Sequence, residues 1–302
     1  MRKILVTGGT NFVSRYVAEY FVSKGDKVYV LNRGSKKQSE GVIHIKGDRR
    51  NLTDELKGYS FDAVLDVTAY TDEDVRGLLD ALDNFGEYIL VSSSAVYPEN
   101  TKFPCKETDK TGPNAIWGDY GTNKIKAEKE LLERVPHAYI LRPPYLYGRM
   151  QNLYREPFVF DCADKDRPFV IPKEGRMKLQ FFDVEDLCRF MDILIEKKPR
   201  ERIFNVGNGE VIPVKDWVKL CYEVAGKEPV LLSADDSHPV RSYFCFYDYE
   251  YSLDVSRMRE YMPDTKPLLQ GLKEEYEWYK AHEAEMVKKP YIEYIDKYML
   301  KV

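Results

Sequence analysis

The first half of the chain alternates short apolar runs with segments of helical periodicity, and this alternation limits the fold more than any other feature. Helical spacing begins at Phe12 and recurs over Asp72–Asn84 and Tyr120–Arg134. Strands separated by helices pair in parallel and are covered on both faces, so the sequence predicts an α/β protein with a doubly wound parallel sheet. The β-branched, apolar runs predict strands at Lys3–Val6, Lys27–Leu31, Val42–Ile45, Asp62–Thr68, Glu87–Ser92 and Ala138–Leu141.

The first of these strands runs into a glycine turn, Thr7-Gly8-Gly9-Thr10, that opens the first helix. A turn of this kind directs free backbone N–H groups toward an anion, and glycine lets the backbone approach a pyrophosphate closely. Its place in the first βα unit predicts a Rossmann-type site for a dinucleotide, NAD or NADP. The residues expected to contact the dinucleotide here are Gly8, Gly9, Thr10, Asn11, Phe12 and Val13.

The end of the second strand is expected to select between the two dinucleotides. An acid at this point holds the ribose hydroxyls of NAD, whereas a basic residue accepts the 2′-phosphate of NADP. This chain has Asn32 and Arg33 and no acid, and a guanidinium suits a phosphate. We therefore expect both residues to contact the cofactor and favour NADP. The alternative is a basic loop that only faces solvent.

A tyrosine and a lysine lie four residues apart where the third predicted helix begins. This spacing places Tyr120 and Lys124 on the same helix face. A free tyrosine has a pKa of about 10, and a nearby cation favours its phenolate. A phenolate can take the proton of a substrate hydroxyl while a hydride leaves for a nicotinamide. The pair is a candidate acid/base, although Tyr–Lys pairs are also common on exposed helices.

Five segments, in order along the chain, resemble the extended short-chain dehydrogenases/reductases, in particular the NAD-dependent epimerase/dehydratase family. The glycine turn is similar to the family's T-G-G-x-G-F-I-G, with Asn11 and Ser14 in place of the second and third glycines. Asparagine tolerates positive φ and serine is small, so both departures are compatible with the turn. The five segments are Val6–Val13, Val91–Pro98, Leu141–Gly148, Phe181–Leu187 and Phe204–Gly209.

The resemblance implies roles for individual residues. Ser93 aligns with the family's catalytic serine or threonine, which hydrogen-bonds the reacting oxygen, and Ser94 is its neighbour. Pro143 lies in the segment that lines the nicotinamide end of the cofactor, and Asp48 falls where the family's Asp approaches the adenine ring. With the Tyr120–Lys124 pair, these residues complete the expected site. The alternative for the serines is that they only satisfy the turn at a strand end.

The second half of the chain is less regular. Residues 1–148 are expected to form the dinucleotide-binding domain, and residues 149–302 a smaller mixed α/β substrate-binding region, with residues 181–210 returning to the sheet. Helical patterns recur at Val214–Ala225 and Leu268–Ala284. The aromatic run over 243–251 is expected to pack as a strand rather than to form a platform for stacking bases, and it is also a candidate to line the substrate pocket.

The chemistry expected of this site is hydride transfer assisted by a tyrosine. The resemblance favours an epimerase or oxidoreductase acting on a sugar nucleotide or similar hydroxylated small molecule, because the Thr-Asp-Glu triplet of the family's dehydratases is absent. Leu179 replaces the arginine with which many of the family's epimerases bind a diphosphate, which leaves open an NADP-dependent reductase of a non-nucleotide carbonyl. Cationic donors that are candidates to replace that arginine are Arg176, Lys178 and Arg241.

A function of a different class is also open. Asn11, Leu31–Gly34 and Gly47–Arg49 resemble an atypical group that includes the chloroplast stem-loop RNA-binding proteins. There the fold would serve as a binding module for RNA or a regulatory nucleotide. Against this, 46 Lys and Arg and 50 Asp and Glu give a net charge of −4, which offers no general attraction to nucleic acid. The intact Tyr120–Lys124 pair also favours an enzyme.

Other classes are disfavoured by simple patterns. No apolar run reaches the roughly 18 residues of a membrane helix. The five cysteines form no C-x-x-C pair and the four histidines share no motif, so neither disulfides nor a metal site is expected. We therefore expect a cytoplasmic protein that binds no membrane. The resemblance implies a homodimer formed through two helices, one of them the Tyr120 helix.

Overall fold

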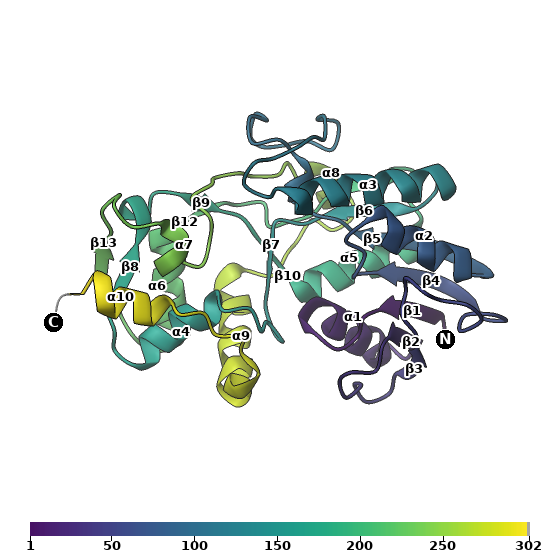
Figure 1. Cartoon of the computed structure of the whole chain (residues 1–302), viewed down its shortest axis with the longest axis horizontal. Coiled ribbons are helices and arrows are strands. Elements are labelled where there is room, and N and C mark those ends of the chain that lie inside the picture. The colour runs from purple at the N-terminus through teal and green to yellow at the C-terminus, as the bar shows by residue number, and fades with distance from the viewer. Residues whose placement is uncertain (301–302) are drawn as a thin grey trace.

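The structure, a computed structural model, describes residues 1–300 and is organised around one parallel sheet (Figure 1). Seven strands follow the order β11-β6-β5-β4-β1-β2-β3, and every neighbouring pair is parallel. The prediction of a Rossmann-type parallel sheet is confirmed. Its strands are β1 (Lys3–Thr7), β2 (Lys27–Asn32), β3 (Ile43–Lys46), β4 (Ser60–Asp66), β5 (Asn84–Val91), β6 (Tyr139–Arg142) and β11 (Ile203–Asn205).

The direction in which strands are added reverses at β1. The chain adds β2 and β3 on one side of β1, then returns to add β4, β5 and β6 on the other side. At such a reversal, neighbouring connections leave in opposite directions and open a crevice beyond the carboxyl ends of the strands. The ends of β1 at Thr7 and of β4 at Asp66 therefore mark the place where a ligand is expected.

Two helical layers cover the sheet. Successive side chains of a strand point to opposite faces, and in β1 Ile4 and Val6 belong to one core cluster while Leu5 belongs to another. The cluster around Ile4 and Val6 is covered by α1 (Phe12–Ser23) and α5 (Val184–Lys197). The cluster around Leu5 is covered by α2 (Asp72–Ala81) and α3 (Asp119–Arg134).

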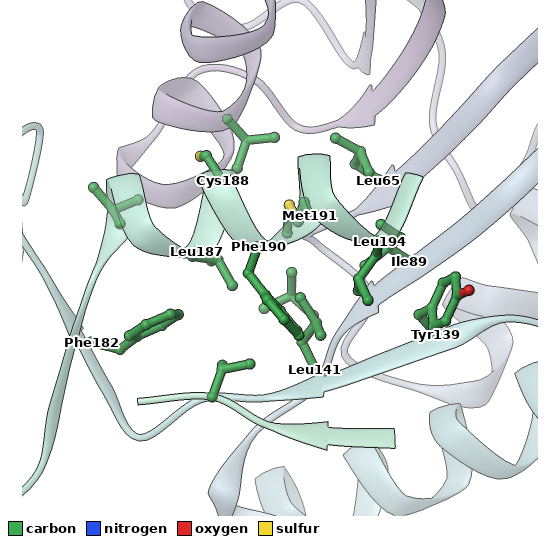
Figure 2. Close-up of a cluster of buried hydrophobic side chains, with 14 of the residues drawn as sticks. Leu65, Ile89, Tyr139, Leu141, Phe182, Leu187, Cys188, Phe190, Met191 and Leu194 are labelled. Atoms are coloured by element: carbon green, nitrogen blue, oxygen red, sulfur yellow. The ribbon is translucent and has the colours of Figure 1, made fainter. Parts of the chain in front are cut away.

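Figure 2 shows how α5 packs on the first face. Leu187, Met191 and Leu194 recur at helical spacing and are completely buried, with Ile89 and Leu141 of the sheet in the same cluster. The helix begins after Asp183, whose carboxylate accepts a hydrogen bond from the N–H of Glu185. Truncating a buried leucine such as Leu194 to alanine costs about 2–5 kcal/mol of stability.

The second region has its own core, rich in aromatic side chains such as Phe158, Trp217 and Phe246. Its helices are α4 (Glu156–Asp164), α6 (Val214–Val224), α7 (Val240–Tyr243), α9 (Leu268–His282) and α10 (Tyr291–Tyr298). Its strand pairs are β7 (Tyr145–Tyr147) with β10 (Phe181–Asp183), β9 (Lys178–Leu179) with β12 (Ile212–Pro213), and β8 (Phe169–Ile171) with β13 (Leu231–Ser233). Within the same stretch of sequence, β11 is a strand of the main sheet and α5 covers one face of that sheet. The short helix α8 (Ser256–Arg259) packs on β11, and its Met258 belongs to the core of the main sheet.

One prediction about this region is wrong. The aromatic run over 243–251 does not form a strand: Tyr243 ends α7, and the residues after it follow an irregular path. Phe244, Phe246 and Tyr251 are nevertheless buried in the second core. Residues 243–246 are all buried and Tyr247 is exposed, so burial along the run does not follow the alternation of a strand. Within residues 1–300, no helix is both long enough and apolar enough to cross a membrane.

Candidate active site

The glycine turn lies at the carboxyl end of β1, beside the crevice. Gly8 and Gly9 have φ values of +92° and +83°, and a Cβ at Gly9 would lie 2.7 Å from Val30 Cγ1. Only glycine fits that position without displacing β2. Gly8, Thr10 and the residues up to Ser14 line the crevice, whereas Gly9 is buried behind it. Gly9 therefore shapes the turn rather than facing a ligand.

Of the two residues that replace glycines of the family pattern, Asn11 is accommodated in a way that its residue type did not indicate. Asn11 has an extended backbone with φ −135°, so the position does not use the tolerance of asparagine for positive φ. Its side-chain Oδ1 instead accepts a hydrogen bond from Lys36 Nζ at 2.5 Å. The Ser14 hydroxyl donates to the Asn11 carbonyl at 2.9 Å. Asn11 thereby holds a lysine ammonium against the turn, which the sequence did not predict.

Asn32, at the end of β2, is hydrogen-bonded to the glycine turn as well. Asn32 Nδ2 donates to the Gly8 carbonyl at 2.6 Å, and its Oδ1 accepts from the N–H of Gly34 at 2.9 Å. Asn32, Arg33 and Asp48 line a cavity of about 390 Å³. This cavity meets a larger one at Gly8, Thr68 and Tyr70. The structure thus brings the three residues expected at the adenosine end to one place.

A buried ion pair lies beside the smaller cavity, which Arg49 lines. Asp66 is completely buried, and Arg49 Nη1 and Nη2 donate to its two oxygens, each at 2.8 Å. The hydroxyls of Thr7 and Tyr88 donate to the same carboxylate at 2.8 and 2.6 Å. Burial alone would raise the pKa of Asp66, but the Arg49 guanidinium outweighs it and the pKa is lowered. Arg49 belongs to the Gly47–Arg49 segment, but sequence reasoning missed the pair because nothing in the sequence links Arg49 to Asp66.

Several motifs that are distant in sequence meet in one buried network beneath α3. Arg142 pairs with Glu128 at 2.6 Å and donates to the Tyr97 hydroxyl at 2.9 Å. Tyr97 donates to Asn205 Oδ1 at 2.7 Å, and the Ser92 hydroxyl donates to Glu128 at 2.5 Å. These residues come from four segments of the chain. Their network fixes α3 against the ends of β5, β6 and β11, next to the serines that line the crevice.

Close packing of α3 places Tyr120 beside Ser93. Gly121 allows this packing, because a Cβ there would lie 2.3 Å from the Ala95 carbonyl oxygen. Ser93 lies within hydrogen-bonding reach of the Tyr120 hydroxyl, and both residues line the crevice. Tyr120 is 40% exposed, so its side chain is open to a ligand. The structure therefore brings together the proposed acid/base and the proposed hydrogen-bonding serine.

Lys124 lies one helical turn below Tyr120 and is 2% exposed. Its Nζ donates to the carbonyl oxygens of Ala69 at 2.7 Å and Val91 at 2.8 Å. An ammonium has three donors, so these two bonds leave one donor for another partner. Nζ also lies 5.0 Å from the ring centroid of Tyr70 and 6.0 Å from that of Tyr120.

The electrostatics of the pair differ from the expectation. Burial lowers the pKa of Lys124 to about 8. Desolvation raises the pKa of Tyr120, and the opposing hydrogen bond with Ser93 does not cancel it. The expectation that the nearby cation favours the phenolate is thus not met by the chain alone. The phenol holds its proton at neutral pH, which suits delivery of that proton to a carbonyl oxygen.

The cavity that Ser93, Tyr120 and Lys124 line, which we call the main cavity, has a volume of about 710 Å³ and extends from the glycine turn to the second region. A larger hollow of about 1010 Å³ adjoins it at Asn11 and Lys36. Pro143 and Ser94 line it as expected. The candidate substrate residues Arg176, Lys178 and Arg241 do not line it. Arg241, for example, lies over the Tyr247 ring at 4.8 Å. Tyr145 and Leu146 of the Leu141–Gly148 segment and Tyr251 of the aromatic run also line the main cavity. The second region adds residues that the sequence did not single out: Asn152, Leu153, Arg155 and Val287.

Ligands of other kinds have less support among the described residues. No group of three His, Cys, Asp or Glu side chains within residues 1–300 is arranged to hold a metal ion. The five cysteines are free and buried. The two connected cavities instead fit an elongated molecule with phosphates near Gly8, since this part of the glycine turn lies where they meet. Fold and site together define an α/β protein of the Rossmann type, with a Ser-Tyr-Lys group on the crevice beside its glycine turn.

The comparisons place the chain in a family. The model of the NAD dependent epimerase/dehydratase family matches residues 4–207, more than half of the chain, and the chain belongs to this family. A chloroplast stem-loop binding protein of 41 kDa (b) from Arabidopsis thaliana is 26% identical over 91% of this chain and 78% of its own length. The dTDP-4-dehydro-6-deoxy-D-allose reductase of a Streptomyces species is 24% identical over 93% of this chain and 97% of its own length.

Solved structures show the same fold. The UDP-glucose 4-epimerase of Thermotoga maritima, determined with UDP-glucose, superposes with a TM-score of 0.75 at 22% identity, over 92% of this chain and 99% of that one. The dTDP-glucose 4,6-dehydratase of Bacillus anthracis, determined with NAD, superposes with a TM-score of 0.74 at 17% identity, over 95% and 99%. The preference for NADP finds no support in these relatives.

Proposed function

We propose that the chain is an NAD(P)-dependent enzyme that interconverts a hydroxyl and a keto group on a sugar nucleotide or a similar hydroxylated small molecule. The observation that carries this proposal is the convergence of Ser93, Tyr120 and Lys124 on the cavity that the glycine turn also lines. Residues 1–148 would hold the cofactor, and residues 149–302 would supply most of the substrate contacts.

The roles of the residues follow from their positions. When bound, the nicotinamide cofactor supplies the hydride acceptor or donor. Tyr120 moves the proton at the reacting oxygen, and Ser93 hydrogen-bonds that oxygen. Lys124 is fixed by two carbonyls and offers its remaining donor toward the cavity. Without the paired carboxylates that eliminate water, the site suits epimerisation or simple oxidoreduction rather than dehydration.

Two experiments test the proposal. Denaturing the purified protein and identifying any released nucleotide shows whether NAD or NADP is bound. A panel of sugar nucleotides is then added while nicotinamide absorbance and product identity are followed. The Tyr120→Phe variant is expected to keep cofactor binding and to lose at least about 100-fold in turnover, the usual contribution of a general acid/base.

A binding function without catalysis is the second candidate, because the chloroplast stem-loop binding protein resembles this chain over 91% of its length. In that case Tyr120→Phe would leave the function intact, and RNA would bind with an affinity that falls steeply as salt is raised. A carbonyl reductase is the third candidate. Its substrate would be a non-nucleotide carbonyl, and it is favoured by Leu179 at the family's arginine position.

A further inference from the structure

We propose that Arg155 is the specificity-determining residue of the substrate site, and that it pairs with an oxyanion of the substrate, a carboxylate or a phosphate. This inference rests on the proposed function, because it assumes that the substrate occupies the end of the main cavity formed by the second region. Arg155 lies immediately before α4 and lines that cavity. None of the three cations suggested by the sequence does so.

The charge of the cavity wall supports an anionic ligand. The charged residues that line the main cavity are Lys36, Lys124 and Arg155, and no Asp or Glu of residues 1–300 is among them. Lys36 is held at the glycine turn by Asn11, and Lys124 lies beneath Tyr120. Arg155 is therefore the cation that the second region adds to the wall. A cleft lined by one sign of charge attracts ligands of the opposite sign.

The guanidinium of Arg155 is held in place before any ligand arrives. It lies 5.7 Å from the ring centroids of both Tyr145 and Phe246, and Nη2 donates to the Leu146 carbonyl. Its side chain is 14% exposed, and Nη1 makes no hydrogen bond with residues 1–300. A fixed guanidinium with a free N–H pair loses little entropy on binding, and it matches the geometry of a carboxylate or phosphate.

The protein supplies only a weak counter-charge. Glu156 Oε2 lies 3.7 Å from Arg155 Nε, beyond hydrogen-bonding distance. Both Glu156 oxygens are buried without a hydrogen-bond partner, and so is Arg155 Nε. Desolvation raises the pKa of Glu156, which favours its neutral form. Arg155 thus retains charge that a substrate oxyanion can neutralise.

The anion site is close to the reacting group. Tyr145 contacts Arg155 and lies with its ring centroid 5.7 Å from that of Tyr251. Tyr251 in turn lies within hydrogen-bonding reach of Ser94, the residue after Ser93. Two layers of side chains therefore separate Arg155 from the serine that faces Tyr120. A substrate that places a hydroxyl at Tyr120 can bring an oxyanion on the same molecule to Arg155.

The test compares ligand affinities of the cofactor-loaded protein by calorimetry. The probes are UDP-glucuronate, UDP-glucose and UDP, and the variants are Arg155→Gln, Arg155→Lys and, as a matched control, Arg176→Gln on the exposed surface. If Arg155 pairs with a sugar carboxylate, Arg155→Gln weakens UDP-glucuronate by about 10- to 100-fold and leaves UDP-glucose within about twofold. If it pairs with the diphosphate, all three probes weaken by a similar factor. In both cases Arg155→Lys recovers part of the loss, and Arg176→Gln matches the wild type.

A result in which Arg155→Gln lowers the melting temperature but changes no affinity would overturn the inference, since a purely structural arginine behaves in this way. Arg155→Met, which removes the charge and keeps an aliphatic side chain, keeps the test valid if the glutamine variant does not fold. If no sugar nucleotide binds the wild-type protein, the proposed function fails. The arginine is then tested with inorganic phosphate and glucuronate as probes. Affinities for both probes that are unchanged from the wild type in a variant without the charge, Arg155→Gln or Arg155→Met, would refute the anion site.

Discussion

The buried ammonium of Lys124 makes stability depend on pH in a way that can be calculated. Its pKa is about 8 in the folded chain against an ordinary value of 10.5. Between these values the unfolded chain binds more protons than the folded chain, so the free energy of unfolding rises with pH. One pKa unit corresponds to about 1.4 kcal/mol. For this shift, the contribution of Lys124 to stability grows by about 2 kcal/mol between pH 7 and pH 9.5.

The measurement is urea unfolding of the cofactor-free wild type, Lys124→Met and the control Lys126→Met, which removes an exposed lysine from the same helix. The methionine variant also loses two hydrogen bonds to carbonyls, but that loss does not change with pH. We therefore expect the wild type to gain about 2 kcal/mol relative to Lys124→Met over this range, and Lys126→Met to follow the wild type. If the free energies of unfolding of the wild type and Lys124→Met changed in parallel with pH, the pKa of Lys124 would not be lowered by burial, and this prediction would be refuted.

Three further predictions concern stability and cofactor binding. Gly9→Ala is expected to destabilise the fold by at least about 1 kcal/mol, because of the positive φ and the approach to Val30; an unchanged melting temperature would contradict this. Lys36→Met is expected to weaken dinucleotide binding by about tenfold without changing stability, measured by fluorescence titration; unchanged affinity would remove Lys36 from the phosphate site. Glu275→Gln is expected to raise the melting temperature at pH 8 and to lose this advantage toward pH 5. Burial raises the pKa of Glu275, so its carboxyl destabilises the fold as pH rises; a constant difference would refute this.

The fold was predictable because its signals are local. Each strand of the main sheet has an apolar run, and the glycine turn marks the first crossover, so periodicity and one motif define the sheet. The irregular path after α7 was not predictable in this way. The aromatic residues of this segment indicate that it is buried, and both a strand and an irregular loop can bury such side chains. The sequence also did not predict the short helix α10, because it has few apolar residues outside its tyrosines.

The candidate site was predictable only where its chemistry is carried by motifs. Ser93, Tyr120 and Lys124 could be named because a resemblance gave them fixed spacings. Arg155 and the Arg49–Asp66 pair could not, because their significance depends on which segments the fold brings together. The three substrate cations proposed from the sequence were chosen for charge alone. Charge without a position in space does not distinguish a cavity wall from a solvated surface.

The segment after α9 returns to the edge of the crevice. Val287 forms a β-bridge with Leu153, its N–H donates to the Asn152 carbonyl at 3.0 Å, and all three residues line the main cavity. The same two segments are also joined by the stacked rings of Tyr154 and Tyr291 and by the ion pair of Lys288 with Asp161. A movement that widened the entrance for a ligand would therefore have to carry both segments together or break all of these contacts at once.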